Sequence, residues 1–257
     1  MLPQKQKWKK DMTYGVSAST FGHALGLLGC VSDFVYYQRN YFNTELGFQG
    51  NDATAHGIRT EATARTVYEM LTEQRVDDGG FYIYRNDRRL ACSPDGIIWD
   101  DDLPLQGDST NEPPSPPPVD GGGGAGCGGR PPRKIKRLLE IKSPFRALYD
   151  NTKGPLYEPF GIPQQYMCQM QGQMAIAGAT ECDFFVYLHH PEAQVECWRV
   201  YFSEEFWAWA APKLLQVSQW IKEGPSAEEL NRSFSFGTFD YKRIKVDPLV
   251  SPLVLST

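Results

Sequence analysis

Hydrophobic and polar residues alternate along the chain with periods that predict both helices and strands. Apolar residues three and four positions apart predict helices at about 55–73, 163–178 and 206–221. Runs rich in aromatic and β-branched residues predict strands at 81–84, 89–99, 182–188 and 195–202. With a further strand at 139–142, this order predicts an α/β (α+β) core with a mixed, roughly five-stranded sheet flanked by helices. The pattern after residue 233 leaves open whether the tail covers a sheet edge or contacts another subunit.

The stretch 139–142 alternates apolar and charged residues. On a β-strand, Leu139 and Ile141 face one side, while Glu140 and Lys142 share the other side at about 7 Å from each other. By itself such a pattern is typical of a surface ion pair on an amphipathic strand. Asp95 changes this interpretation, because it ends the preceding strand-like run and is followed by a turn glycine. Together these residues favour a chemical site.

The predicted helix at 55–73 has an apolar stripe that, extended backward, passes through Glu61. A carboxylate on the inward face of a helix needs a partner, because burying it alone is costly. Arg65, four residues further on, would be a local partner. A metal ion shared with Asp95 would be a functional one, and the other motifs favour it.

Residues 100–132 form a low-complexity insert that is first Asp-rich, then Pro-rich and then Gly-rich. Such a composition buries too little apolar surface to offset chain entropy, so it predicts disorder. A phosphate-binding P-loop is excluded, because no Gly-Lys-Ser/Thr follows the glycines. The insert accounts for the long separation of Asp95 and Glu140 as an enlarged loop inside one hairpin. We therefore expect a single domain at 1–257.

The chain carries a net charge of −5, which argues against a generally basic mode of DNA binding. Its bases are nevertheless concentrated at 1–10 and 130–153. In the second cluster, Lys136, Arg146 and Lys153 are candidate contacts for backbone phosphates, which would give salt-dependent and sequence-independent binding.

The six cysteines show neither a zinc spacing nor a quartet that would suit an iron–sulfur cluster. Several lie in apolar runs, where a reduced thiol behaves as a small hydrophobic group. No apolar run has transmembrane length, and no signal peptide is evident near Met1. We expect an intracellular protein in a reducing compartment that makes no use of a membrane.

Four segments carry a family resemblance. Pro94-Asp95 followed by Glu140-Ile141-Lys142 matches the PD-(D/E)xK nuclease signature. Segments 57–62, 91–96, 139–145 and 165–171 resemble, in the same order, motifs of the lambda-exonuclease-like (YqaJ-type) viral recombination nucleases, or alkaline exonucleases. The resemblance covers roughly residues 12–200. It implies a restriction-endonuclease-like core and a nuclease that hydrolyses phosphodiester bonds with Mg²⁺ or Mn²⁺, using two ions.

The resemblance also implies roles for individual residues. Asp95 would bridge the two ions, Glu140 would bind the ion that activates water, and Glu61 would serve the second site. The carbonyl of Ile141 is a further candidate ligand. The implied catalytic residues are Asp95, Glu140, Lys142, Glu61 and Gln169. Lys142 would orient the water, assist its deprotonation and stabilise the phosphate charge, and Gln169 would orient metal-bound water.

Ser17 and Ser19 precede a helical pattern and have two interpretations. They are good N-cap residues. In the family resemblance, the same segment holds a 5′-phosphate, with Ser19 at the family's serine position. The family's upstream arginine is absent, and Thr13 and Tyr14 are the residues nearest to its place.

By resemblance, the enzyme would degrade linear double-stranded DNA from its ends, 5′ to 3′, and produce single strands for recombination or genome processing. A single-strand annealing protein would be a partner, a ring-shaped homotrimer would be the assembly, and a viral enzyme would work in the host cytoplasm or nucleus. One alternative is a structure- or site-specific endonuclease on the same core. Another is a non-catalytic DNA-binding recombination module, against which the intact Asp95, Glu140 and Lys142 argue.

Overall fold

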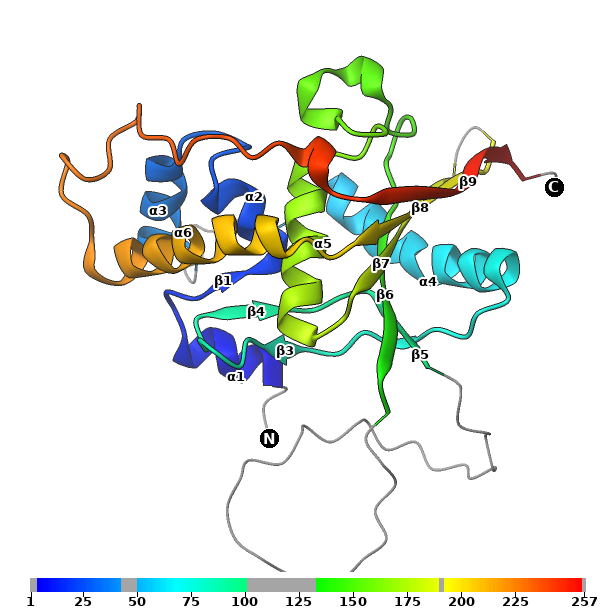
Figure 1. Ribbon diagram of the computed structural model, residues 1–257, viewed down its shortest axis with the longest axis horizontal. Coiled ribbons are helices and arrows are strands. Elements are labelled where there is room, and N and C mark those ends of the chain that lie inside the picture. The colour runs from blue at the N-terminus through cyan, green and yellow to red at the C-terminus, as the bar shows by residue number, and fades with distance from the viewer. Residues whose placement is uncertain (1–3, 43–49, 101–132, 190–191, 256–257) are drawn as a thin grey trace, which may run out of the picture.

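The computed structural model describes residues 4–42, 50–100, 133–189 and 192–255 (Figure 1). The predicted disordered insert therefore lies almost entirely outside the described residues. Within them, no helix is both long enough and apolar enough to cross a membrane. The described cysteines are free thiols, and all but Cys30 are buried. Burial raises the pKa of the Cys92 and Cys168 thiols, as expected for cysteines that act as core residues.

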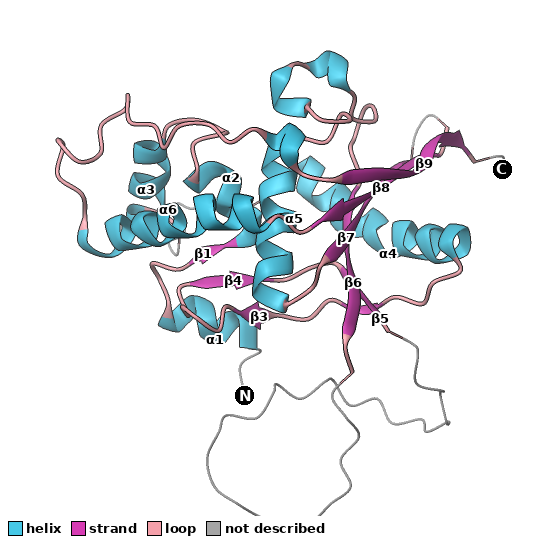
Figure 2. Ribbon diagram, viewed as in Figure 1, coloured by secondary structure: helices cyan, strands magenta, loops and turns pink. Residues whose placement is uncertain are grey.

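The main sheet is mixed and has six strands in the order β2-β5-β6-β7-β8-β9 (Figure 2). Its strands are β2 (Asp77–Asp78), β5 (Gly96–Trp99), β6 (Ile135–Lys142), β7 (Glu181–Leu188), β8 (Gln194–Tyr201) and β9 (Val246–Val254). Only the pairing of β6 with β7 is parallel, and it sets Glu140 opposite Phe184 and Lys142 opposite Val186. The sheet is mixed as predicted and is slightly wider than the roughly five strands expected.

The sequence left open whether the C-terminal tail covers a sheet edge or contacts another subunit. As β9 it pairs antiparallel with β8 and covers that edge of the sheet. The preceding turn, η4 (Tyr241–Arg243), places the buried Tyr241 hydroxyl 3.0 Å from the Cys168 sulfur. The tail is thus part of the fold of the core.

A second, three-stranded sheet has the order β1-β4-β3. It consists of β1 (Val16–Ser17), β4 (Leu90–Cys92) and β3 (Tyr82–Ile83). The predicted single strand at 89–99 is therefore wrong: β4 belongs to this sheet and β5 to the main one. Pro94, which has no amide hydrogen for a sheet ladder, lies at the break. As a result, Asp95 lies where the chain passes from one sheet to the other.

Gly96, expected to be a turn residue, is instead the first residue of β5. A side-chain carbon at this position would lie 2.4 Å from a Val76 methyl group and 3.3 Å from the Leu139 Cβ. Glycine is needed because β5 must approach both neighbours closely directly after Asp95.

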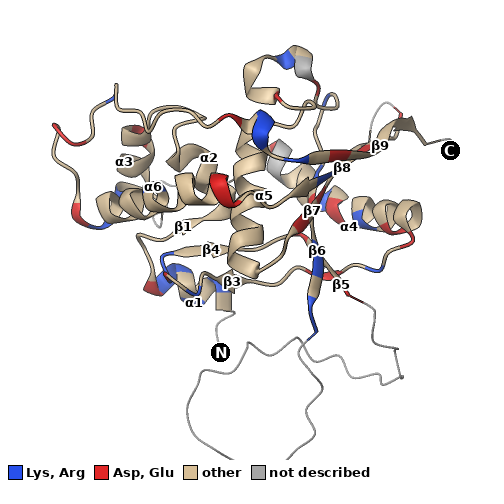
Figure 3. Cartoon of the chain, in the orientation of Figure 1, with Lys and Arg blue, Asp and Glu red and all other residues tan. Residues whose placement is uncertain are grey.

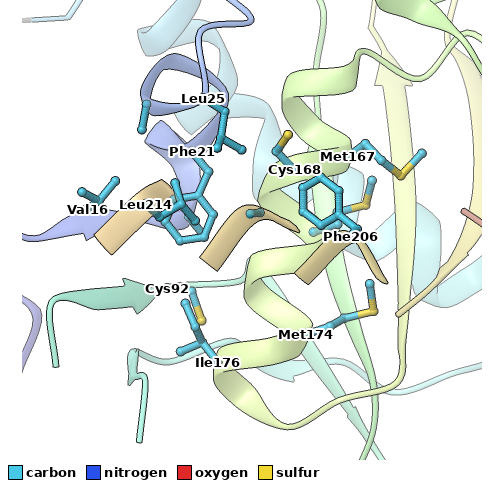
Figure 4. Packing of buried hydrophobic residues seen from close by; sticks show 14 of the residues in the cluster. Val16, Phe21, Leu25, Cys92, Met167, Cys168, Met174, Ile176, Phe206 and Leu214 are labelled. Atoms are coloured by element: carbon cyan, nitrogen blue, oxygen red, sulfur yellow. The ribbon is translucent and has the colours of Figure 1, made fainter. Parts of the chain in front are cut away.

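Helices cover both faces of the main sheet (Figure 1). The helices are α1 (Gln4–Asp11), α2 (Phe21–Ala24), α3 (Val31–Asn40), α4 (Asp52–Thr72), α5 (Gln164–Ala177) and α6 (Glu204–Glu223), with single turns η1 (Ala18–Thr20), η2 (Asn151–Lys153) and η3 (Pro155–Tyr157). The larger hydrophobic core gathers side chains around α5 (Figure 4) and includes Leu138. The smaller core lies under α4 and includes Leu139 and Ile141. Strand β6 therefore has an apolar side against α4, and its Glu140 and Lys142 face α5.

Candidate active site

Backbone hydrogen bonds attach Asp95 to strand β6. The Asp95 amide donates to the Leu139 carbonyl at 3.1 Å, and the Ile141 amide donates to Asp95 Oδ2 at 2.7 Å. Because Glu140 lies between these two residues, both carboxylates are brought to the same point of the sheet. The break between β4 and β5 makes this possible, since it leaves Asp95 outside either regular ladder.

Glu140 is completely buried, and both of its oxygens accept hydrogen bonds. Gln169 Nε2 donates to Oε1 at 2.6 Å, and Gln173 Nε2 donates to Oε2 at 2.7 Å. Lys142 Nζ also donates to Oε1. The two glutamines lie four residues apart on α5, on the same side of that helix. They fix the orientation of Glu140 without neutralising its charge.

Lys142 is held as a cation. Burial lowers its pKa, but the carboxylates of Glu140 and Asp95 outweigh that effect, so the pKa is raised overall. The ammonium also lies 4.9 Å from the centre of the Tyr166 ring, which favours a positive charge. Lys142 is therefore suited to donate hydrogen bonds and to stabilise negative charge.

The electrostatics of Asp95 indicate a shortage of positive charge. Burial and the nearby Glu140 raise the pKa of Asp95 to about 7, although Lys142, the Ile141 amide and Arg65 oppose the rise. Four acids, Asp95, Glu140, Glu61 and Asp78, interact here with two bases, Lys142 and Arg65. Among the described residues of the cluster, negative charge thus exceeds positive charge.

The sequence offered two partners for Glu61, namely Arg65 and a metal ion shared with Asp95. The contacts of Glu61 on α4 bear on both. Arg65 Nη2 lies 3.5 Å from Glu61 Oε1 and also donates to the Asp95 carbonyl at 2.6 Å. The Glu61 side chain is 43% exposed, so it lies at the margin of the apolar stripe and not within it. Its pKa is raised by burial and by Asp95. The local ion pair therefore exists, and it lies next to Asp95.

The donor atoms fit a magnesium or manganese ion. Carboxylate and carbonyl oxygens are the ligands these ions prefer, and Mg²⁺ is often held by only one or two carboxylates together with water and substrate phosphates. Asp95, Glu140 and the Ile141 carbonyl offer such oxygens. Among the described residues, no group of three or more His, Cys, Asp or Glu side chains forms a complete metal site. Glu61 therefore completes no three-residue metal site with Asp95 and Glu140, although its charge interacts with Asp95.

The three bases predicted to contact DNA are exposed. Lys136 is exposed on β6, where basic residues line the strand (Figure 3), and Arg146 is exposed after it. Lys153 donates to the Leu148 carbonyl and lies over the Tyr149 ring. Their contact with backbone phosphates stays a prediction.

Ser17 and Ser19 lie beside the strand that leads into Asp95, because β1 pairs with β4 and sets Ser17 opposite Ala91. Their hydroxyl oxygens are 3.2 Å apart. Ser17 occupies the N-cap position of η1, but its side chain makes no capping hydrogen bond. The capping interpretation is therefore wrong for Ser17.

Two contacts were missed by the sequence analysis: the hydrogen bond from Gln173 to Glu140 and the one from Arg65 to the Asp95 carbonyl. Gln173 follows Gln169 by one helical turn, and this spacing could have identified it. No sequence pattern could have identified the hydrogen bond from Arg65 to Asp95, because its acceptor is a backbone carbonyl.

The fold and the arrangement of the site together identify the class of protein to which this chain belongs. The described residues form a restriction-endonuclease-like fold, with Asp95 and Glu140-Ile141-Lys142 meeting on its central strand. Residues 7–180 match the YqaJ-like viral recombinase domain, and the chain belongs to this family.

Solved structures agree with this assignment of the fold. The chain is similar to the crystal structure of an alkaline exonuclease (LHK-Exo) from Laribacter hongkongensis, with 20% identity and a TM-score of 0.57 over 84% of this chain and 92% of that one. The structure of LHK-Exo in complex with dAMP matches equally well. No curated protein matches the chain in sequence.

Proposed function

We propose that this chain is a metal-dependent deoxyribonuclease that degrades linear double-stranded DNA from its ends, 5′ to 3′, and leaves single strands for recombination or genome processing. The observation that carries the proposal is the meeting of Asp95, Glu140 and Lys142 on strand β6, with Glu140 oriented by two glutamines. Membership of the viral recombinase family and the alkaline-exonuclease fold support the same activity.

When bound, Mg²⁺ or Mn²⁺ ions would supply an activated water and stabilise the leaving oxygen. Asp95, Glu140, Glu61 and the Ile141 carbonyl would hold them. The cationic Lys142 would orient the attacking water and stabilise the negative charge that develops on the scissile phosphate. Gln169 and Gln173 would keep Glu140 in one orientation throughout, because each donates to a different carboxylate oxygen.

The dependence on DNA ends, the 5′-to-3′ direction, the homotrimer and the annealing partner follow from the family resemblance and remain predictions. Ser17 and Ser19 would receive the terminal phosphate. An endonuclease on the same fold would share the metal chemistry, but it would also cut a duplex that has no ends.

Digestion of end-labelled linear duplex DNA tests the proposal. With Mg²⁺ or Mn²⁺, we expect a 5′ label to be released before a 3′ label, intact closed circles to survive, and EDTA to abolish the activity. The variants Asp95→Ala, Glu140→Ala and Lys142→Ala should be inactive. Full activity in any of them would contradict the assignment, and cutting of closed circles would replace an exonuclease by an endonuclease.

A further inference from the structure

Arg65 connects helix α4 to the break between the two sheets. Its Nη2 atom donates to the Asp95 backbone carbonyl at 2.6 Å and lies 3.5 Å from Glu61 Oε1. These two contacts differ in strength. The pair with Glu61 is long, and the Glu61 side chain is 43% exposed, so water screens the attraction. The hydrogen bond to the carbonyl is short and has a charged donor, which makes it the stronger contact of Arg65.

The main chain of Asp95 is held on both sides of its Cα atom. On one side, the Asp95 amide donates to the Leu139 carbonyl. On the other side, the Asp95 carbonyl accepts the hydrogen bond from Arg65. Because both flanking peptide groups are fixed, the direction in which the Asp95 side chain leaves the backbone is fixed as well. The carboxylate then meets the Ile141 amide, which donates to its Oδ2 atom.

The chain around Asp95 is also closely packed. A side-chain carbon at Gly79 would overlap the Pro94 carbonyl oxygen and lie 3.1 Å from the Gly96 amide nitrogen. The backbone at Gly79 therefore lies directly against the residues on either side of Asp95. Gly79 and strand β6 hold this segment through backbone atoms, whereas Arg65 holds it through a side chain. A substitution can thus remove the contact of Arg65 while the backbone contacts stay.

The Nε atom of Arg65 is buried and has no hydrogen-bond partner among the described residues. A buried donor without a partner is uncommon and lowers stability. An arginine placed only to stabilise the fold would be expected to satisfy it. Such local departures from an optimal fold are common at functional sites.

From these contacts we infer that Arg65 is a positioning residue of the proposed metal site: it fixes the Asp95 carboxylate through the Asp95 carbonyl and leaves Glu61 available to a cation. The inference rests on the proposed nuclease function and deepens it, because it names the residue that sets the geometry of the ligand proposed to bridge the ions. A role of charge alone is the alternative, in which Arg65 competes with the metal for the acids. The two roles predict opposite effects on metal binding.

Binding of Mn²⁺ to the full chain without DNA, measured by electron paramagnetic resonance, separates the two roles. Arg65→Met removes the charge and the donor, whereas Arg65→Lys keeps the charge but shortens the side chain by one bond and withdraws the donor from the carbonyl. If Arg65 positions Asp95, both variants should bind Mn²⁺ roughly 10- to 100-fold more weakly than the parent. Tighter binding by Arg65→Met, or parental binding by either variant, would overturn the inference.

Hydrogen–deuterium exchange of the metal-free protein gives a second readout. In both Arg65 variants the amides of Asp95 and Ile141 should exchange faster, because their hydrogen bonds depend on the position of Asp95. Amides in the middle of α6 should keep the parental rates. Equally faster exchange in α6 would indicate a general loss of stability, and unchanged exchange at Asp95 would show that Arg65 does not hold it. Each of these results contradicts a positioning role.

Arg39→Met is the matched control for the loss of an arginine bound to backbone carbonyls. Arg39 Nη1 donates to the carbonyls of Trp220 and Ile221 at 3.1 and 2.8 Å, at the end of α6. This variant should bind Mn²⁺ like the parent. Equal weakening by Arg39→Met and Arg65→Met would mean that the effect is not specific to Asp95, and the positioning role would be wrong.

A cleavage assay with linear duplex DNA and Mn²⁺ keeps the two proposals apart. If the Arg65 variants bind Mn²⁺ weakly as expected but the parent cleaves no DNA, the nuclease function fails and the positioning role stands. If the parent cleaves DNA while the Arg65 variants bind Mn²⁺ and exchange like the parent, only the positioning role fails.

Discussion

Two fully buried carboxylates lie on neighbouring strands and on opposite faces of the sheet, Glu140 on β6 and Asp183 on β7. Asp183 accepts four hydrogen bonds, from the Tyr68 hydroxyl at 2.7 Å, from Arg137 at 3.2 Å and from Arg199 at 2.9 and 3.2 Å. These bonds use the capacity of a carboxylate. With the adjacent Glu181, the group contains two acids and two arginines, so its charges balance.

Glu140 differs in each of these respects. Two of its three partners are neutral amides, its cation is a lysine, and its surroundings contain more acids than bases. The excess is visible in the pKa of Asp95, which is raised to about 7. Asp183 is thus saturated by fixed, balancing partners, whereas Glu140 is oriented by its glutamines and left short of positive charge, as is common for acids at functional sites.

The largest expected effect is an opposite outcome for the two carboxylates. Glu140→Gln should reduce nuclease activity about a thousandfold or more. It should lower the free energy of unfolding less than Asp183→Asn does, because Lys142 keeps Asp95 as a second counterion and the amide groups of the neighbouring glutamines can turn to accept a hydrogen bond. Asp183→Asn should lower the free energy of unfolding by roughly 3–5 kcal/mol, since it leaves buried arginines without their counterion, and should spare activity while the protein is folded.

Urea unfolding without metal and nuclease assays at a temperature where all variants are folded would measure both effects. Asp33→Asn is a control: it breaks the exposed pair with Arg232 and should cost no more than about 1 kcal/mol. Equal losses of stability in the Glu140 and Asp183 variants would show that the two clusters do not differ as described.

A smaller effect is expected for the amides that orient Glu140. Gln173→Met keeps the packing but removes the donor to Oε2, and it should reduce activity about 10- to 100-fold and raise the Mg²⁺ concentration needed for half-maximal activity. Gln171→Met is the matched control on the same helix. Gln171 bonds the Tyr201 carbonyl and the Ser203 amide, so its loss should lower stability by roughly 1–3 kcal/mol without changing the metal titration. Identical metal titrations for the two variants would rule out a positioning role for Gln173.

Much of the fold could be predicted because its main elements have strong local patterns. The helix predicted at 163–178 is α5, and the strands predicted at 182–188 and 195–202 are β7 and β8. The small sheet and β9 could not be predicted in the same way. Strands of two residues carry no period, and β9 contains two prolines and exposed positions, so its pairing with β8 depends on tertiary contacts.

The sequence could indicate that Asp95, Glu140 and Lys142 come together, but not which of their atoms make contact. Alternation on β6 indicates that Glu140 and Lys142 share a face, and the family motifs indicate which acids to pair with them. No local pattern specifies that the Ile141 amide binds Asp95, or that the strand breaks at Pro94 to allow it. Those features depend on how the two sheets join. That junction is formed by segments that lie far apart in the sequence, so no local pattern specifies it.

Glu196 on β8 is a third buried carboxylate, and its environment shares features with that of Glu140 but differs from it in others. It is 6% exposed, and its Oε2 has no hydrogen-bond partner among the described residues. Burial and the nearby Asp150 raise its pKa from an ordinary value of 4.5 to about 7, although Lys153 opposes the rise. Like Glu140 it lacks balancing charge, but no glutamine pair among the described residues orients it.

Because the folded protein keeps a proton on Glu196 that the unfolded chain releases, its free energy of unfolding should fall as the pH rises from about 4.5 to about 7 and then level off. Glu196→Gln removes this contribution, so between pH 5 and pH 8 the parent should lose about 1–2 kcal/mol relative to the variant. Urea unfolding across this pH range, with the exposed Glu228→Gln as a control, measures the difference. A difference between parent and Glu196→Gln that does not change with pH would mean that the carboxylate is already ionised in the folded protein, and Glu196 would then belong with Asp183 as a satisfied structural acid.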